Sequence, residues 1–374
     1  MSIKFLPFAA PGVQQLSPYL PGKPVEQLER ELGIKDSIKL ASNENPLGPS
    51  KLAVKAATTA IKSVNLYPDG GGYLLSHALA EKHQVDAACI TLGNGSNDVL
   101  ELVARAFLSA GCSSVFSEYA FAVYPIVTQA IGATSIIAEA YSSDHVSLPY
   151  GHDLDAIFNA IDHTTRVVFI ANPNNPTGTW IDPDALYEFL TKVPENVIVV
   201  LDEAYSEYMP DKLKPDSNSL LKKFTNLVLT RTFSKMYGLA GLRIGYAVSN
   251  PEIADLLNRV RQPFNANLIA QEAALAALED TDHVTDSIEL NNTGMQQLIS
   301  GLDLLGLSYI PSIGNFLSVN VAKDAGPVYE DLLREGVIVR PLANYKLPEH
   351  LRITVGKHEQ NIRVLAALKK VLGL

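Results

Sequence analysis

The stretch RTFSKMYGLAGLRIGY, residues 231–246, places Lys235 between small hydroxyl side chains and a glycine-rich run, with Arg243 following eight positions later. A lysine becomes a nucleophile towards carbonyl groups when desolvation or a cationic neighbour lowers its pKa. Thr232 and Ser234 offer hydroxyl donors, and the glycines allow a close approach of the backbone. This pattern predicts an anion pocket built around a nucleophilic amine, whereas an isolated lysine would normally lie on the surface.

The composition limits the class of protein and the kind of ligand to which this amine can belong. The chain has 374 residues, of which 47% are hydrophobic and 19% charged, which is typical of a globular protein and excludes general disorder. Its length indicates two domains. The net charge of −10 supplies no basic field for nucleic acid, so a bound anion must be held by local groups.

The two cysteines, Cys89 and Cys112, belong to no CxxC or Cys/His cluster, so we expect neither a disulfide framework nor a metal site. A reducing cytoplasm fits this usage. The N-terminal run 1–12 is too short and too interrupted by proline for a signal peptide. The uncharged window 119–138 contains proline, glycine and hydroxyl residues, which favours a helix and a strand of a water-soluble protein over a membrane span.

Three short apolar runs end in polar motifs. Residues 167–170 lead into NPNNPTG, residues 197–201 into DEAY, and residues 226–229 into TRTFSK. Their alternation with helical patterns indicates an α/β fold with a mostly parallel mixed sheet flanked by helices. Ligands of such sheets collect beyond the carboxyl ends of the strands, so these three exits are expected to line one cleft.

The domain organisation follows from the same patterns. Asp182 and the proline after it predict a helix running to residue 192, and further helices are expected at 252–262, 267–280 and 284–305. Beyond residue 306 the pattern changes to a smaller α+β unit with short strands and a final helix from 358. The predicted division is an N-terminal arm (1–35), a large domain (36–270) and a small domain that packs with the arm (271–374).

Two further segments suggest ligand-binding chemistry. Asp202 follows a buried run, so its carboxylate is expected inside the protein, where it needs a cationic partner; a helix N-cap is the alternative. In GNGSNDVLELVARAF (93–107) the apolar residues recur at helical spacing, which places Gly95, Ser96 and Asn97 where a helix begins. The free amides of a helix start form a ready phosphate site.

Together these segments resemble the fold-type I pyridoxal-phosphate aminotransferases. The resemblance implies that pyridoxal 5'-phosphate is the cofactor, that Lys235 binds it covalently and moves protons, and that Asp202 holds its pyridinium nitrogen. Tyr205 and Asn175 would bond the phenolic oxygen of the cofactor, and Phe121 would stack on its ring. The expected phosphate ligands are Gly95, Ser96, Asn97, Thr232, Ser234 and Arg243.

The motifs LASNENPLGPS (40–50), YPDG, GVIVRP (336–341) and LRITVG (351–356) narrow the resemblance to the histidinol-phosphate aminotransferases. The family implies transfer of an amino group between histidinol phosphate and 2-oxoglutarate in histidine biosynthesis. Arg352 and Arg340 would hold the substrate phosphate by bidentate hydrogen bonds. Tyr19 and Asn45 would also contact the substrate, and Tyr67 would reach the phosphate of the neighbouring subunit in a homodimer.

Alternatives remain open at this stage. An aromatic amino-acid aminotransferase or a threonine-phosphate decarboxylase of the same lineage would carry the same motifs, because an arginine pair serves either a carboxylate or a phosphate. A sensor that binds the cofactor without catalysis is a third possibility, although the lysine, aspartate and tyrosine are all in place. Phe121 and Tyr67 also fit ordinary packing roles, in the core and beside a turn respectively.

Overall fold

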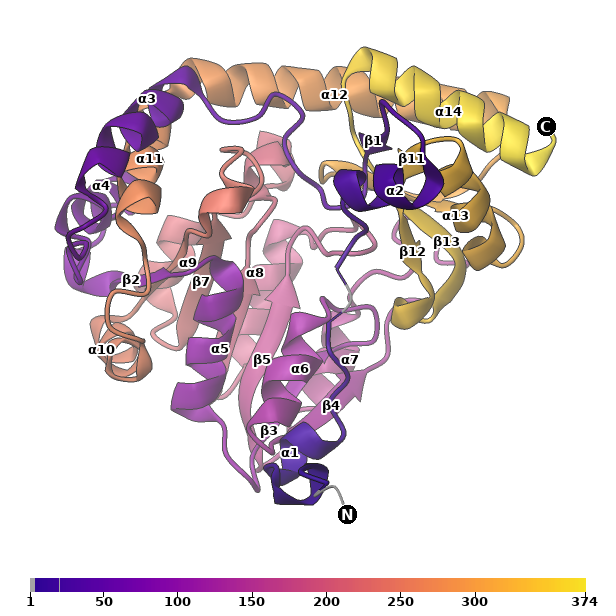
Figure 1. Cartoon of the computed structure of the whole chain (residues 1–374). Coiled ribbons are helices and arrows are strands. Elements are labelled where there is room, and N and C mark those ends of the chain that lie inside the picture. The colour runs from indigo at the N-terminus through magenta and orange to yellow at the C-terminus, as the bar shows by residue number, and fades with distance from the viewer. Residues whose placement is uncertain (1–3, 20) are drawn as a thin grey trace.

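The larger of two units is built on a seven-stranded sheet in the computed structural model, which describes residues 4–19 and 21–374 (Figure 1). The strand order is β2-β8-β7-β6-β5-β3-β4, and β8 alone in this sheet runs antiparallel to its neighbours. The mostly parallel mixed sheet predicted from the sequence is therefore confirmed. Its strands are β2 (Ile90–Gly93), β3 (Ser113–Ser117), β4 (Thr134–Ala138), β5 (Thr165–Ala171), β6 (Ile198–Asp202), β7 (Leu227–Thr232) and β8 (Gly245–Ser249).

Helices cover both faces of this sheet, which explains why its central strands are continuous apolar runs. In β5, Val167 and Phe169 join the apolar layer under α5, α6 and α10, whereas Val168 and Ile170 join the layer under α4, α7, α8, α9 and α11. Polar side chains are thereby driven to the strand ends. The helices of this unit are α3 (Lys51–Ala60), α4 (Tyr73–His83), α5 (Ser96–Phe107), α6 (Val123–Ala130), α7 (Leu154–Asn159), α8 (Pro183–Lys192), α9 (Ser217–Lys223), α10 (Pro251–Val260) and α11 (Leu268–Glu279).

The smaller unit combines a four-stranded antiparallel sheet, ordered β12-β13-β10-β9, with the parallel pair β1-β11. The long helix α12 runs along the top of the molecule from the large unit into this small one (Figure 1). The elements are α2 (Val25–Leu32), β1 (Ile38–Lys39), α12 (Thr281–Leu304), β9 (Tyr309–Ile310), β10 (Phe316–Asn320), α13 (Ala325–Arg334), β11 (Val337–Ile338), β12 (Arg340–Leu342), β13 (Leu347–Thr354) and α14 (His358–Leu372).

Both ends of the chain contribute to the small unit. Leu28 of α2 packs against Leu333 and Ile338, and β1 pairs with β11. Helix α11 instead packs on α3 and buries Ala270 and Ala274 in the core of the large unit. We therefore propose that the boundary lies near the start of α12 rather than at residue 270, and that residues 21–41 belong with the small unit.

Two local predictions are confirmed by the elements. Helix α8 begins after Asp182, whose carboxylate accepts hydrogen bonds from the backbone N–H groups of Asp184 and Ala185. The uncharged window 119–138 contains the short helix α6 and the strand β4. Among the described residues, no helix has the length and apolar character needed to cross a membrane.

A buried ion pair joins the ends of β6 and β7 on the face opposite to Asp202. Arg231 Nη2 lies 2.6 Å from Glu203 Oε2, and both side chains are almost completely buried. Glu203 directly follows Asp202, and Arg231 directly precedes Thr232. Because side chains alternate along a strand, the ion pair lies on the other face and holds the backbone next to these two cleft residues. It thereby fixes Asp202 relative to Thr232.

Candidate active site

A cavity of about 270 Å³ lies where β5, β6 and β7 end, between the two units. It is lined from the large unit by the three polar strand exits and by the start of α5, and from the small unit by Arg340 and Arg352. The three exits therefore do meet in one cleft. Of the side chains predicted for the site, the cavity is lined by Tyr19, Ser96, Asn97, Phe121, Asn175, Asp202, Tyr205, Thr232, Ser234, Lys235, Arg243, Arg340 and Arg352.

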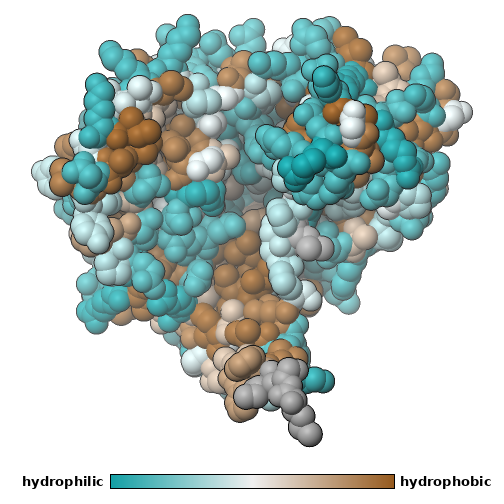
Figure 2. Space-filling model, in the orientation of Figure 1, coloured by the Kyte–Doolittle hydropathy of each residue, from teal (hydrophilic) through white to brown (hydrophobic). Residues whose placement is uncertain are grey.

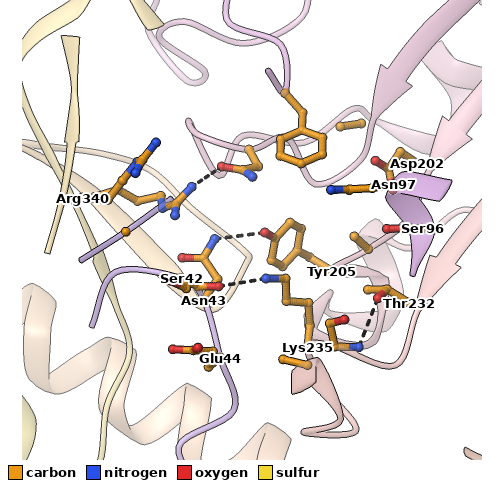
Figure 3. Close-up of a pocket in the computed structure, with 18 of the residues that line it drawn as sticks. Ser42, Asn43, Glu44, Ser96, Asn97, Asp202, Tyr205, Thr232, Lys235 and Arg340 are labelled. Atoms are coloured by element: carbon orange, nitrogen blue, oxygen red, sulfur yellow. Dashed lines mark hydrogen bonds between the residues drawn. The ribbon is translucent and has the colours of Figure 1, made fainter. Parts of the chain in front are cut away.

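Lys235 projects into this cavity from the turn after β7 (Figure 3). Its Nζ donates a hydrogen bond of 2.8 Å to the carbonyl oxygen of Ser42. Burial, and next the positive charge of Arg352, lower the pKa of Lys235 to about 7, against a weaker opposing effect of Glu44. The cationic neighbour with the larger effect is thus Arg352, not the Arg243 singled out from the sequence, and near neutral pH much of the amine is uncharged and nucleophilic.

Asp202 is the last residue of β6 and is only 4% exposed. Its Oδ2 accepts a hydrogen bond of 3.0 Å from the hydroxyl of Tyr124, while Oδ1 has no hydrogen-bond partner among the described residues. Burial raises the pKa of Asp202 to about 6. An unpartnered buried carboxylate oxygen is costly, so the position calls for a ligand N–H donor.

The corner beside α5 is shaped for an anion. Gly95, the N-cap of α5, has φ +87°, and a Cβ there would lie 2.3 Å from Nη2 of Arg243. Glycine is therefore required for the guanidinium to lie against the helix start. Arg243 Nη1 also lies 3.4 Å from Ser234 Oγ, and the Ser234 amide donates to Thr232 Oγ1. Helix amides, hydroxyls and a guanidinium together suit a phosphate group.

The wall beside Lys235 links the two units. Arg352 donates hydrogen bonds to Asn175 Oδ1 and to the carbonyl oxygen of Ala41. Tyr205 Oη accepts a hydrogen bond of 3.0 Å from Asn43 Nδ2, and burial raises the pKa of Tyr205 to about 12. Tyr205 is therefore a neutral hydroxyl at physiological pH.

The far side of the cavity carries positive charge without a matching carboxylate. The guanidinium of Arg340 lies 5.7 Å from the ring centroid of Tyr19, a cation–π contact. No ion pair within 4.0 Å joins Arg340 or Arg352 to an acidic side chain in residues 4–19 and 21–374. Burial lowers the pKa of Arg352, which is the expected response of a buried guanidinium without a counter-ion. The pair is thus available to an anionic ligand.

Two predicted residues lie elsewhere. Asn45 faces away from the cavity: its Nδ2 donates to the carbonyl oxygen of Met236 and to Ser287 Oγ, so it holds the turn before α3 and is not placed to bind substrate. Tyr67 is 83% exposed and stacks on Phe264 with ring centroids 4.8 Å apart, outside the cavity of its own chain.

Three participants were not predicted from the sequence: Tyr124, Asn43 and the Ser42 carbonyl. Tyr124 lies three residues after Phe121 in the segment FAVY (121–124), and the two rings pack edge to face with their centroids 5.9 Å apart. The only signal for it was a hydroxyl-bearing aromatic on a short helix that follows a strand. Asn43 is one of two asparagines in SNENP, and the spacing alone does not say which of them faces the cavity.

Comparisons with known proteins agree with this geometry. The chain matches the family described as aminotransferase class I and II over residues 35–368, and it belongs to that family. It is 57% identical over 371 residues, 99% of each chain, to histidinol-phosphate aminotransferase 2 of Pseudomonas aeruginosa, and 55% identical over the whole of both chains to the protein of that name from Methylococcus capsulatus. Its relatives place it among the histidinol-phosphate aminotransferases. A solved structure of the Sinorhizobium meliloti histidinol-phosphate aminotransferase in complex with pyridoxal-5'-phosphate covers 97% of each chain with a TM-score of 0.88 at 30% identity.

The residues present fit such a cofactor. The unpartnered Oδ1 of Asp202 suits a protonated ring nitrogen, the cradle around Gly95 suits a phosphate, and the amine of Lys235 suits an aldehyde. These three features lie on one cavity at the ends of neighbouring strands. The site thus offers a hydrogen-bond acceptor for the ring nitrogen, an anion-binding corner for the phosphate and an amine for the aldehyde.

The reactivity of Lys235 in the cofactor-free protein should rise through pH 7. Brief acetylation followed by peptide mass spectrometry is expected to give a labelling midpoint near pH 7, because only the neutral amine reacts. Arg352→Met removes the charge that most depresses this pKa and should move the midpoint to higher pH. Exposed Lys212 of the same chain serves as the internal reference, and an unmoved midpoint in the variant would contradict the assigned cause.

Asp202→Asn should stabilise the cofactor-free protein while weakening cofactor binding. The folded pKa of about 6 lies above the ordinary 3.8, so the penalty of the ionised carboxylate is absent near pH 4 and fully present above pH 6. The variant should therefore gain about 1 to 3 kcal/mol in free energy of unfolding at pH 8 and about half as much at pH 5. Urea unfolding followed by the fluorescence of Trp180 measures this, and an equal change at both pH values would refute it.

Proposed function

We propose that this chain transfers an amino group between L-histidinol phosphate and 2-oxoglutarate, with pyridoxal 5'-phosphate as its cofactor. The observation that carries the proposal is the pairing of a neutral, accessible amine at Lys235 with two guanidinium groups, Arg340 and Arg352, that have no acidic partner among the described residues. A substrate with an amine at one end and a phosphate at the other matches this arrangement, because its amine would lie at Lys235 and its phosphate at the two arginines. The reaction serves histidine biosynthesis.

Bound pyridoxal 5'-phosphate supplies an aldehyde that captures amines and a ring that accepts the electrons of a breaking C–H bond. Asp202 would accept a hydrogen bond from its protonated ring nitrogen, and Tyr205 and Asn175 would bond its phenolic oxygen. Phe121 would lie against its ring. The groups that would hold its phosphate are the amides at Gly95, Ser96 and Asn97, the hydroxyls of Thr232 and Ser234, and the guanidinium of Arg243.

The chain's own contribution to catalysis centres on Lys235. With a pKa near 7, its amine can take up and release a proton at neutral pH, which suits it to act as general base and then as general acid. Its hydrogen bond to the Ser42 carbonyl orients the nitrogen towards the cavity wall when no substrate is present. Lys235 is therefore both the nucleophile and the proton carrier.

Arg340 and Arg352 would bind the phosphate of the amino substrate and a carboxylate of 2-oxoglutarate in turn. Guanidinium groups bond both anions in bidentate fashion, so one pair can serve the two half-reactions. Tyr19 packs under Arg340 and would help to cover the substrate. An aromatic amino-acid aminotransferase would use the same contacts, so the preference for a phosphate-bearing substrate is the property that distinguishes the two functions.

The substrate preference separates these functions. We expect transamination of histidinol phosphate with 2-oxoglutarate at a kcat/KM at least about tenfold above that for phenylalanine, because the phosphate makes additional charge-assisted bonds to the arginine pair. Histidinol, which lacks only the phosphate, is the matched control and should be used poorly. Equal or inverted efficiencies would assign the chain to the aromatic enzymes, and release of carbon dioxide from threonine phosphate would assign it to the decarboxylases.

We further propose that the chain acts as a homodimer in the cytoplasm. An exposed apolar surface extends over α3 and α4, visible at the upper left of Figure 2, and includes Leu52, Val54, Tyr67, Tyr73 and Leu74. Such a patch suits a second copy of the chain, and Tyr67 within it would reach the partner's cofactor phosphate. Both cysteines are free, in keeping with a reducing compartment.

Mixing two inactive variants tests this arrangement. Lys235→Ala subunits combined with Tyr67→Ala subunits should regain up to about a quarter of the wild-type activity, since half of randomly paired dimers are mixed and each then holds one native site. Activity no greater than that of the separate variants would show that Tyr67 does not cross to the partner. Size-exclusion chromatography verifies that both variants still pair.

A further inference from the structure

Three consecutive residues of the segment between β1 and α3 contact three groups of the site. The carbonyl oxygen of Ala41 accepts from Arg352 at 2.8 Å, and the carbonyl oxygen of Ser42 accepts from Lys235 at 2.8 Å. The side chain of Asn43 donates to the hydroxyl of Tyr205 at 3.0 Å. Figure 3 shows the last two of these contacts side by side.

Asn43 is held more firmly than an ordinary loop residue. It is 1% exposed and has φ +55°, a conformation that asparagine tolerates better than most residues. Its N–H donates to Thr354 Oγ1 at 2.9 Å, and its carbonyl oxygen accepts from Asn315 Nδ2 at 3.0 Å. Both partners belong to the small unit, so Asn43 joins that unit to Tyr205 of the large one.

The orientation of the Asn43 amide follows from Thr354. Because the Thr354 hydroxyl oxygen already accepts the Asn43 N–H, its hydrogen is free to be donated, and it is directed at Asn43 Oδ1, 3.2 Å away. With Oδ1 as the acceptor of this bond, Nδ2 is the atom that faces Tyr205 and donates to its hydroxyl oxygen. Tyr205 Oη receives a hydrogen there and so cannot direct its own hydrogen to Asn43.

We propose that Asn43 is a positioning residue that orients the Tyr205 hydroxyl so that its proton is donated into the cavity. Among the described residues, Tyr205 Oη makes no hydrogen bond other than the one it accepts from Asn43. Its hydrogen is therefore available to an acceptor in the cavity. The inference rests on the proposed function, which places the phenolic oxygen of the cofactor within reach of Tyr205.

The surroundings of Tyr205 show how the hydrogen bond from Asn43 affects the Tyr205 hydroxyl as a donor. Burial raises the pKa of its hydroxyl, and nearby Asp202 and Tyr345 act in the same direction. Arg352 and the hydrogen bond from Asn43 oppose this rise, and Lys235 Nζ lies 5.8 Å from the ring centroid. A donor on the phenol oxygen makes the hydroxyl a better donor in turn, because hydrogen bonds in a chain polarise one another. Asn43 should thus strengthen the bond from Tyr205 to an anionic oxygen in the cavity.

Asn43→Asp tests this with little change in shape or in tolerance of the left-handed conformation. The substitution presents an acceptor to Tyr205, which should turn the phenol hydrogen away from the cavity. The bound cofactor's phenolic oxygen then loses a donor, so the pH midpoint of the visible absorbance of the holoenzyme should rise. The same substitution in a Tyr205→Phe background measures the effect of the added charge alone. We expect the shift to be larger with Tyr205 present by about one pH unit, a tenfold change in the ionisation constant.

Equal shifts in the two backgrounds would overturn the proposal, because Asn43 would then act only through charge or packing. Asn315→Ala is the matched control: it removes the bond to the Asn43 backbone without touching the phenol, and it should leave the midpoint in place. If the aspartate variant does not fold, Asn43→Gly keeps the left-handed backbone and its two backbone hydrogen bonds, and the same two-background comparison applies. A wild-type protein that neither binds pyridoxal 5'-phosphate nor shows a pH-dependent absorbance would refute the proposed function instead.

Discussion

The carboxylate of Asp202, buried at the end of β6 with one oxygen unpartnered, is the constraint around which the large unit is arranged. Both faces of the central strands are covered by apolar layers, so charged groups are carried near the strand ends, and Asp202 lies at the carboxyl end of β6. The Arg231–Glu203 pair on the opposite face holds β6 to β7 and leaves the position of Asp202 little freedom. The fold thus maintains a group that is unfavourable by itself and becomes favourable once a donor binds.

Positive charge in the cavity complements that carboxylate and explains the chemistry of Lys235. The chain carries a net charge of −10, yet Arg243, Arg340 and Arg352 all line one cavity. Together with desolvation, two of these guanidiniums favour the neutral form of the lysine. In the proposed function the same charges would attract the anionic ends of cofactor and substrate, so one electrostatic arrangement would serve both binding and the activation of the amine.

Much of this arrangement was predictable from the sequence, because it depends on where buried strands end. Asp202, Asn175 and Lys235 each follow an apolar run, and the shared edge of a parallel sheet brings them together. Asn45 was predicted to contact the substrate, whereas the structure places Asn43 at the cavity; both lie in one polar segment, and only contacts with residues some 200 to 300 positions away decide which faces inward. The link from Tyr124 to Asp202 was likewise missed, since it depends on how α6 packs on the sheet.

Residues of both units line the cavity, so its shape depends on the contacts between the two units. The loop after β5 meets the small unit through Ser318 Oγ, which donates to the Pro176 carbonyl oxygen at 2.6 Å, and through the Ile313 N–H, which donates to the carbonyl oxygen of Gly178. Asn175 in that loop accepts a hydrogen bond from Arg352, so the arginine proposed to bind the substrate is held by the loop proposed to contact the cofactor. Arg352 Nε has no hydrogen-bond partner among the described residues, so an anion can bind this guanidinium while the bond to Asn175 stays in place. The position of the Arg352 guanidinium and the conformation of the loop after β5 therefore depend on the same set of direct hydrogen bonds between the two units.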